Sequence, residues 1–202
     1  MQFVSKSKLR RRSLLGSGST IDWETIARGM TDYSTPFSLP AELVTSVPNY
    51  AYYGRTNLTA VEIAGGVETI GTAAFQNCSA LISITLPNAV TTITSNAFNS
   101  SGITSITIPS PVTSIGSNAF YNCTYLGYVV IQATTPPTLG NGNVFSRTNN
   151  CPIYVPDESV EAYKAAANWS SLASRIFPLS DFSGGVIDNQ QVSGISAERS
   201  AA

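Results

Sequence analysis

The segment that decides the fold is LISITLPNAVTTITSNAF, at residues 81–98. A matching segment, LTAVEIAGGVETIGTAAF, stands 23 residues earlier at 58–75, and another, ITSITIPSPVTSIGSNAF, follows 22 residues later at 103–120. Isoleucine, leucine or valine returns at equivalent places in all three copies, and each copy ends in Ala-Phe. A unit of about 23 residues is too short to bury its own apolar face, so the units must stack on copies of themselves. The repeat therefore predicts a solenoid.

Each unit begins with a short strand. Ile84 and Leu86 alternate with Ser83 and Thr85, which is typical of a half-buried strand, and Pro87 ends it. The next apolar positions predict a second extended or turn-like segment, and residues 95–98 predict a helical turn. The recurring phenylalanines would stack inside the solenoid as a ladder: Phe75, Phe98 and Phe120.

The linked positions in 81–98 and 103–123 resemble the BspA-like, or treponemal-type, leucine-rich repeat, and the resemblance extends over roughly 37–150. It implies a β-rich α/β solenoid of four to five repeats with a C-terminal helical cap. Members of this family are mostly surface or secreted proteins that contact proteins or glycans. No catalytic residues come with the resemblance, so the function it implies is binding.

Residues 151–179 look like the closing segment that often follows such arrays. A helix is expected at 157–167, and it would cover the open end of the solenoid. The residues expected to do so are Val160, Tyr163, Ala167 and Trp169. Residues 180–202 are polar and without periodicity, so we expect a tail that is disordered alone or ordered by a partner.

The chain carries few charges. Of its 202 residues 11% are charged, the net charge is −1, and histidine is absent. The lack of histidine excludes a Ser-His-Asp triad, a Cys-His nucleophile pair and every zinc site with a histidine ligand. From Thr69 to Ser146 there is no Asp, Glu, Lys or Arg, so this stretch cannot hold a carboxylate pair, a calcium cage or an arginine clamp. We therefore expect a non-enzymatic protein with no cofactor and no bound metal.

Residues 1–36 form a basic opening, expected as an arm with a short helix. The segment after Arg12 is too short and too polar for a secretory leader, and no run of about 18 apolar residues predicts a membrane span. The opening resembles those of phage-encoded accessory and tail proteins. We expect the arm to anchor the protein on a partner through its five cations, Lys6, Lys8, Arg10, Arg11 and Arg12. Nucleic-acid binding is disfavoured because no aromatic residues are interleaved with these cations.

Two functions follow from these features. The first is a structural or accessory component of a phage virion, made in the host cytoplasm. It would be bound to capsid or tail proteins and would present the repeat to a host-surface protein or glycan. The alternative is a secreted or surface bacterial adhesin of the same repeat family. Assembly into a homo-oligomer stays open under both.

The solvent-facing side of the predicted strands is the expected binding face. It would present a neutral, hydroxyl-bearing sheet suited to a glycan or a flat protein surface. Its candidate residues are Glu62, Ser83, Thr85, Ser105, Thr107 and Tyr128. The alternative is a solvated face on which Ser and Thr serve strand formation alone. Ice binding is disfavoured because the strands are short and the turns vary.

The three cysteines are expected to be small buried residues. Cys78 and Cys123 hold the same repeat position two units apart, which separates them by about 9–10 Å, beyond the roughly 7 Å limit for a disulfide. A bond between Cys123 and Cys151 is left open. Three cysteines without histidine also make a poor zinc site.

Overall fold

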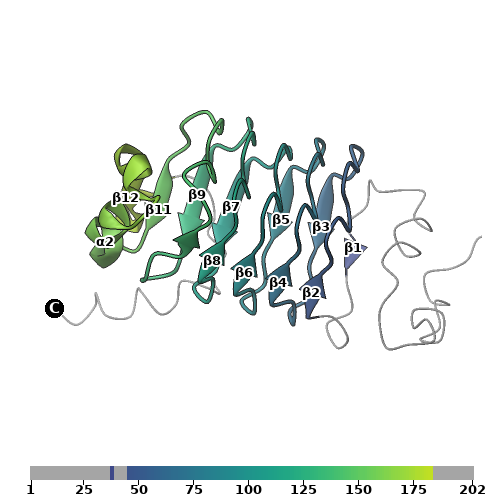
Figure 1. The fold of residues 1–202 in the computed structure, drawn as a ribbon, viewed down its shortest axis with the longest axis horizontal. Helices are drawn as coiled ribbons and strands as arrows, with labels where there is room; N and C mark the ends of the chain where they lie inside the picture. Colours follow the sequence, from purple (N-terminus) through teal and green to yellow (C-terminus); the bar gives the residue numbers. More distant parts are fainter. Residues whose placement is uncertain (1–36, 39–44, 184–202) are drawn as a thin grey trace, which may run out of the picture.

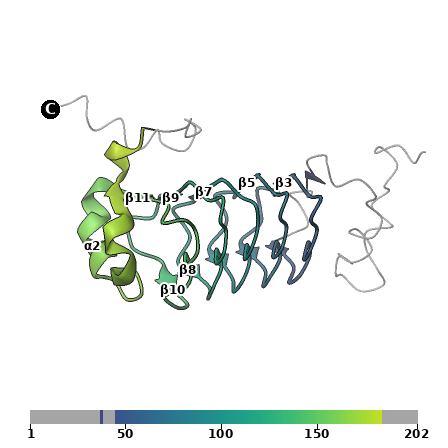
Figure 2. The ribbon, with the colours of Figure 1, turned by 90° about the horizontal axis from the view of Figure 1, so that it is seen from above.

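The computed structural model describes residues 37–38 and 45–183. Within them the chain coils in successive rungs along one axis, and the short strands of neighbouring rungs lie side by side (Figure 1). Figure 2 shows two rows of strands on different sides of the coil. Every strand pair is parallel. This is the solenoid that the repeat predicts.

The first row carries the strands expected from Ser83 to Thr85 and their equivalents. It consists of β1 (Phe37–Ser38), β3 (Ala60–Glu62), β5 (Ser83–Thr85), β7 (Ser105–Ile108), β9 (Tyr128–Ile131), β11 (Ile153–Val155) and β12 (Ile176–Pro178). They form two hydrogen-bonded sheets, ordered β1-β3-β5 and β7-β9-β11-β12. We call the outward surface of this row the strand face.

The second row is one continuous sheet, called the second sheet below. Its strands are β2 (Ser46–Val47), β4 (Thr69–Ile70), β6 (Thr92–Ile93), β8 (Ser114–Ile115) and β10 (Thr138–Leu139). They are ordered β10-β8-β6-β4-β2. Each strand has two residues, of which the second points into the core and is buried.

An aromatic ladder fills the third side of the core. The rings of Tyr52, Phe75, Phe98, Phe120 and Phe145 stack in that order, with centroids 5.1–5.3 Å apart. Trp169 continues the series at 6.0 Å from Phe145. All these side chains are at most 2% exposed. The predicted phenylalanine ladder is confirmed, and it extends at both ends.

The helical turn expected at residues 95–98 is wrong. Asn96 and Ser100 both have left-handed backbone, each with a φ of 57°, which turns alternate peptides toward the neighbouring rung. Consequently the N–H groups of Asn96, Phe98 and Ser100 donate to carbonyls of the following rung, at 2.8–3.0 Å. The intervening N–H groups close tight turns within the rung. Asparagine suits such positions because it tolerates left-handed backbone well, and Asn77 and Asn122 occupy the later of the two in their rungs.

The C-terminal segment both extends and closes the solenoid. β11 and β12 add two strands to the first row. The expected helix is shorter than predicted: η2 (Asp157–Ser159) leads into α2 (Val160–Ala165), followed by η3 (Ser170–Arg175) and η4 (Leu179–Asp181). Because the helix ends at Ala165, Ala167 is exposed, contrary to expectation. Tyr163 and Trp169 are fully buried, as expected.

Cap side chains bind carbonyls of the last complete rung. The Tyr163 hydroxyl donates to the Ala133 carbonyl at 2.7 Å, and the Trp169 indole N–H donates to the Pro137 carbonyl at 2.7 Å. A rung at the end of a solenoid has no next rung to bind its carbonyls, and buried unpaired carbonyls are costly. The cap therefore supplies the missing donors.

Arg175 fastens the cap to the turn that follows the ladder. Its guanidinium donates to the carbonyls of Cys151 and Phe145, at 2.9 and 3.1 Å, and to the hydroxyl of Thr148, at 2.8 Å. A fourth hydrogen bond joins it to the Cys151 sulfur at 3.2 Å. The planar, multiply donating guanidinium suits such a set of acceptors better than an ammonium group does.

We expect Arg175→Ala to lower the free energy of unfolding by about 2 kcal/mol, because the three buried acceptor residues, Phe145, Thr148 and Cys151, lose charge-assisted hydrogen bonds. Lys164→Ala is the matched control, since its 3.2 Å ion pair with the exposed Glu161 contributes roughly 0–1 kcal/mol. Urea unfolding followed by circular dichroism measures both. Equal midpoints for the two variants would contradict this role of Arg175.

Candidate functional site

The six residues predicted for the binding face all lie in the first row. Glu62 pairs with Thr85, and Ser105 pairs with Tyr128. The residues that alternate with them are buried, so the six point outward. Those on β3 and β5 are exposed and those on β7 and β9 are half-buried. Their role in binding stays a prediction.

The strand face changes character along the solenoid. From Glu62 to Thr107 its side chains are acidic or hydroxyl-bearing, whereas its C-terminal end is aromatic. We call that end the aromatic cluster, which consists of Tyr128, Tyr154, Phe177 and Phe182. Phe182 lies 4.9 Å from the rings of both Tyr128 and Tyr154, centroid to centroid. Tyr154 also lies 6.1 Å from Phe177.

Phe182 was not expected to take part. It falls in the segment assigned to a polar tail from residue 180, yet it packs on the strand face. Val130, which follows Tyr128 by two residues on β9 and pairs with Tyr154, is only 1% exposed. The signal that could have found Phe182 is a lone aromatic residue in an otherwise polar segment.

A second hydroxyl row was also missed. In every strand of the second sheet the residue that points outward is a serine or threonine, and these residues pair with one another from strand to strand. These residues are Ser46, Thr69, Thr92, Ser114 and Thr138. Each directly precedes the buried residue of its strand, and that regularity was visible in the sequence.

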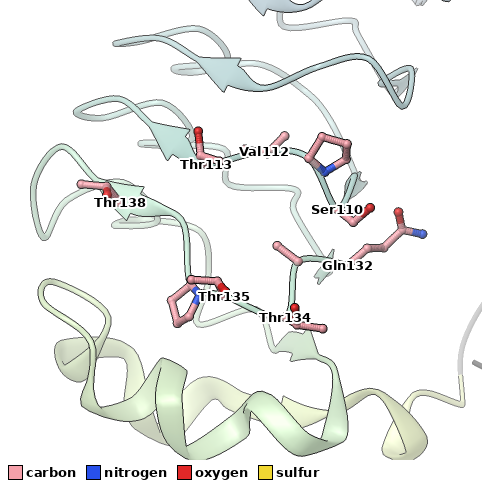
Figure 3. A pocket seen from close by; sticks show the side chains of 10 residues that line it. Ser110, Val112, Thr113, Gln132, Thr134, Thr135 and Thr138 are labelled. Carbon is pink, nitrogen blue, oxygen red and sulfur yellow. The ribbon is translucent and has the colours of Figure 1, made fainter.

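A hollow of about 490 Å³ lies between the loop after β7 and the loop after β9. Figure 3 shows Ser110, Val112 and Thr113 on one side and Gln132, Thr134 and Thr135 on the other. Thr138 of β10 borders the hollow at the second sheet. None of its lining residues carries a charge.

The cysteines are buried and free, so the open question of a Cys123–Cys151 bond is answered in the negative. The thiols of Cys78 and Cys123 donate to the carbonyls of Tyr52 and Phe98, each at 3.0 Å. Burial raises the pKa of the Cys78 thiol to about 12 and that of Cys123 to about 11. Both thiols therefore stay protonated near neutral pH.

These pKa values make the free energy of unfolding depend on pH in the alkaline range. A thiol of the unfolded chain loses its proton near pH 9, whereas the buried thiols of the folded chain keep theirs to a higher pH. Ionisation therefore favours the unfolded state, and stability falls as the pH rises from about 9 toward 12. Burial also raises the pKa of Tyr163, which acts in the same direction. We expect the double variant Cys78→Ala/Cys123→Ala to lose less stability between pH 8 and pH 10.5 than the parent. The same decline in both, measured by urea unfolding, would contradict the thiol contribution.

Residues 37–38 and 45–183 contain no grouping of three or more potential Cys, Asp or Glu metal ligands. No helix in this part of the chain is long and apolar enough to cross a membrane. The five predicted anchoring cations, from Lys6 to Arg12, lie outside the described residues.

Comparison with protein families gives a clear match. The model for the BspA type leucine rich repeat region matches residues 45–173 in six copies. The expectation was four to five repeats. The difference arises because the match continues beyond residue 150, where β11 and β12 extend the first row. No curated protein matches the chain significantly.

Several solved structures share the fold. The leucine-rich repeat protein of T. pallidum is 26% identical, with a TM-score of 0.54 over 61% of this chain and 59% of that one. A leucine-rich repeat protein from Eubacterium ventriosum (21%, TM-score 0.56) and the pneumococcal vaccine antigen PcpA (19%, TM-score 0.52) each match over 71% of this chain. The match spans only 37% and 39% of those two proteins, respectively. At these identities the latter pair shows the fold alone.

Proposed function

Because the chain belongs to the BspA-type leucine-rich repeat family, we propose that it is a non-enzymatic interaction module, displayed at a bacterial cell surface, that binds a protein partner through its strand face. The surface setting follows the expectation for this family. It is preferred to the virion because the comparisons offer no support for a phage protein. The arm on which the virion hypothesis depended also lies outside the described residues.

The observation that carries the proposal is the composition of the strand face. The aromatic cluster adjoins the hydroxyl-bearing positions Ser105 and Thr107, and no charged residue occurs on β5, β7 or β9. The centres of protein interfaces are depleted in charge and enriched in aromatic residues. Such anchors supply a large share of binding energy. A neutral polar surface with aromatic residues at one end fits a protein partner on these grounds.

Binding of the fluorescently labelled full chain to a panel of bacterial and epithelial cells tests the proposal. We expect saturable binding to at least one cell type, lost after the cells are treated with protease. The variant Thr85→Arg/Thr107→Arg places two positive charges on β5 and β7, which carry no charged residue of their own. It should weaken binding by at least about tenfold, which corresponds to about 1.4 kcal/mol.

The matched control is Ala165→Arg, on the exposed side of α2, which adds the same side chain away from the strand face. It should bind as the parent does. Equal binding by both variants, or binding that survives protease treatment, would overturn the proposal.

A further inference from the structure

We propose that the chain carries a second binding site, for a neutral glycan, formed by the hollow after β7 and β9 and continued along the second sheet. The site lies apart from the proposed protein-binding strand face. The shape of the hollow, its fixed wall, its free polar groups and its lack of charge support this site.

The hollow arises from one inserted residue. Ile108 pairs with Ile131, and Ser114 pairs with Thr138. Five residues, 109–113, connect β7 to β8, whereas six residues, 132–137, connect β9 to β10. The extra residue makes residues 132–137 diverge from the preceding loop instead of stacking on it. The resulting volume of about 490 Å³ lies within the usual range of ligand sites, roughly 300–1,000 Å³.

The diverging wall is held in place by the cap. Tyr163 binds the carbonyl of Ala133 near the start of the loop, and Trp169 binds the carbonyl of Pro137 at its end. Both donors are fully buried. The wall is therefore fixed before any ligand arrives, which lowers the entropy lost on binding.

Most polar side chains of the hollow have no partner in the protein. Within residues 37–38 and 45–183, no hydrogen bond to another protein group is made by the side chains of Ser110, Gln132, Thr134, Thr135 and Thr138. Hydroxyl groups both donate and accept, and the Gln132 amide does so through separate atoms. The threonine methyl groups and the rings of Pro111 and Pro136 lie among these polar groups and offer apolar contact to a ligand.

This lining selects the class of ligand. A phosphate, carboxylate or ammonium group would lose hydration without meeting an opposite charge. The hollow also lacks the aromatic and arginine anchors typical of protein interfaces. A sugar ring offers hydroxyl groups that donate and accept, together with apolar C–H faces. The lining therefore fits a neutral sugar unit.

The second sheet offers a path for the rest of a chain of sugars. Thr138, which borders the hollow, begins β10, the edge strand of this sheet, and its N–H donates at 2.9 Å to the carbonyl of Thr113, which borders the hollow directly before β8. From Thr138 the hydroxyl row continues through Ser114 to Thr92, with strands about 4.8 Å apart. A glycan that crosses the strands would meet a hydroxyl group on each rung.

Isothermal titration calorimetry on the full chain tests the site. The probes are four neutral hexasaccharides, maltohexaose, cellohexaose, laminarihexaose and mannohexaose, with a heparin hexasaccharide as the charged comparator. We expect at least one neutral probe to bind and heparin not to bind. Thr134→Val/Thr138→Val removes two hydroxyl groups at nearly constant shape and should weaken binding by at least about tenfold.

The matched control, Thr85→Val/Thr107→Val, makes the same change on the strand face and should leave glycan affinity unchanged. Tyr163→Phe removes only the hydrogen bond to Ala133 and should weaken binding severalfold while circular dichroism stays unchanged. Failure of all four neutral probes, tighter binding of heparin, or equal losses in the two valine pairs would overturn the site. Such a failure would leave the proposed function standing, because that function is tested separately by protease-sensitive cell binding that depends on Thr85 and Thr107.

Discussion

Replacing Phe98 by alanine should lower the free energy of unfolding by about 3–5 kcal/mol, the range for deleting a buried aromatic side chain. Phe98 stands in the middle of the ladder, stacked on Phe75 at 5.3 Å and on Phe120 at 5.2 Å, and is fully buried. The cavity would lie between rungs, and in a repeat protein each rung is stabilised chiefly by its neighbours. A domain is typically stable by only about 5–15 kcal/mol, so this one change removes a large fraction.

The control is Tyr125→Ala, which removes an aromatic side chain that is 70% exposed. It should change stability by no more than about 0.5 kcal/mol. Urea unfolding monitored by circular dichroism gives both values. A loss below about 1 kcal/mol for Phe98→Ala would show that the ladder is not a main source of stability.

Gly102→Ala should be almost as damaging, with a loss of about 3 kcal/mol, at the upper end for overpacking. A Cβ atom on Gly102 would lie 2.1 Å from the carbonyl oxygen of Ser79 in the preceding rung. The clash is with backbone, which cannot rotate away as a side chain could. The two rungs would have to separate, which also strains the hydrogen bond from the Gly102 N–H to the Cys78 carbonyl, at 3.1 Å.

Gly65→Ala provides a contrasting control, because a Cβ atom there meets nothing within 4 Å. That change should be neutral or stabilise the chain by up to about 1 kcal/mol, through the lower entropy of the unfolded state. The same loss at both glycines would mean that rung spacing does not limit this fold.

The repeat itself could be predicted because the buried positions of each rung recur at a fixed spacing that can be seen in the sequence. Burial recurs with the same 22–23 residue spacing as the rungs, so the positions of Ile84, Ile106 and Phe98 indicated strands and an aromatic ladder. The helical turn at residues 95–98 could not be judged in the same way. Left-handed backbone at Asn96 and Ser100 depends on hydrogen bonds to the next rung, and those partners are distant in sequence.

The proposed binding surfaces show the same division. Glu62, Ser83 and Thr85 were found because alternation with buried residues marks an outward position. The two-residue strands of the second sheet are too short to alternate, so their hydroxyl row shows in the sequence only as a serine or threonine that recurs before the buried residue of each repeat. The inserted residue behind the hollow is visible in the sequence, whereas the packing of Phe182 and the wall fixed by Tyr163 and Trp169 depend on contacts that no local pattern reveals.

The central claim is that the strand face contacts a protein partner, and site-specific photo-crosslinking tests it most directly. A photoreactive phenylalanine analogue would be placed at Thr107 in one full-length variant and at Ala165 in another, and each would be irradiated on cells that bind the parent chain. The account predicts a discrete crosslinked protein from the Thr107 position and none from Ala165. A product from Ala165 alone, or no protein product from Thr107 while the chain remains bound, would contradict it.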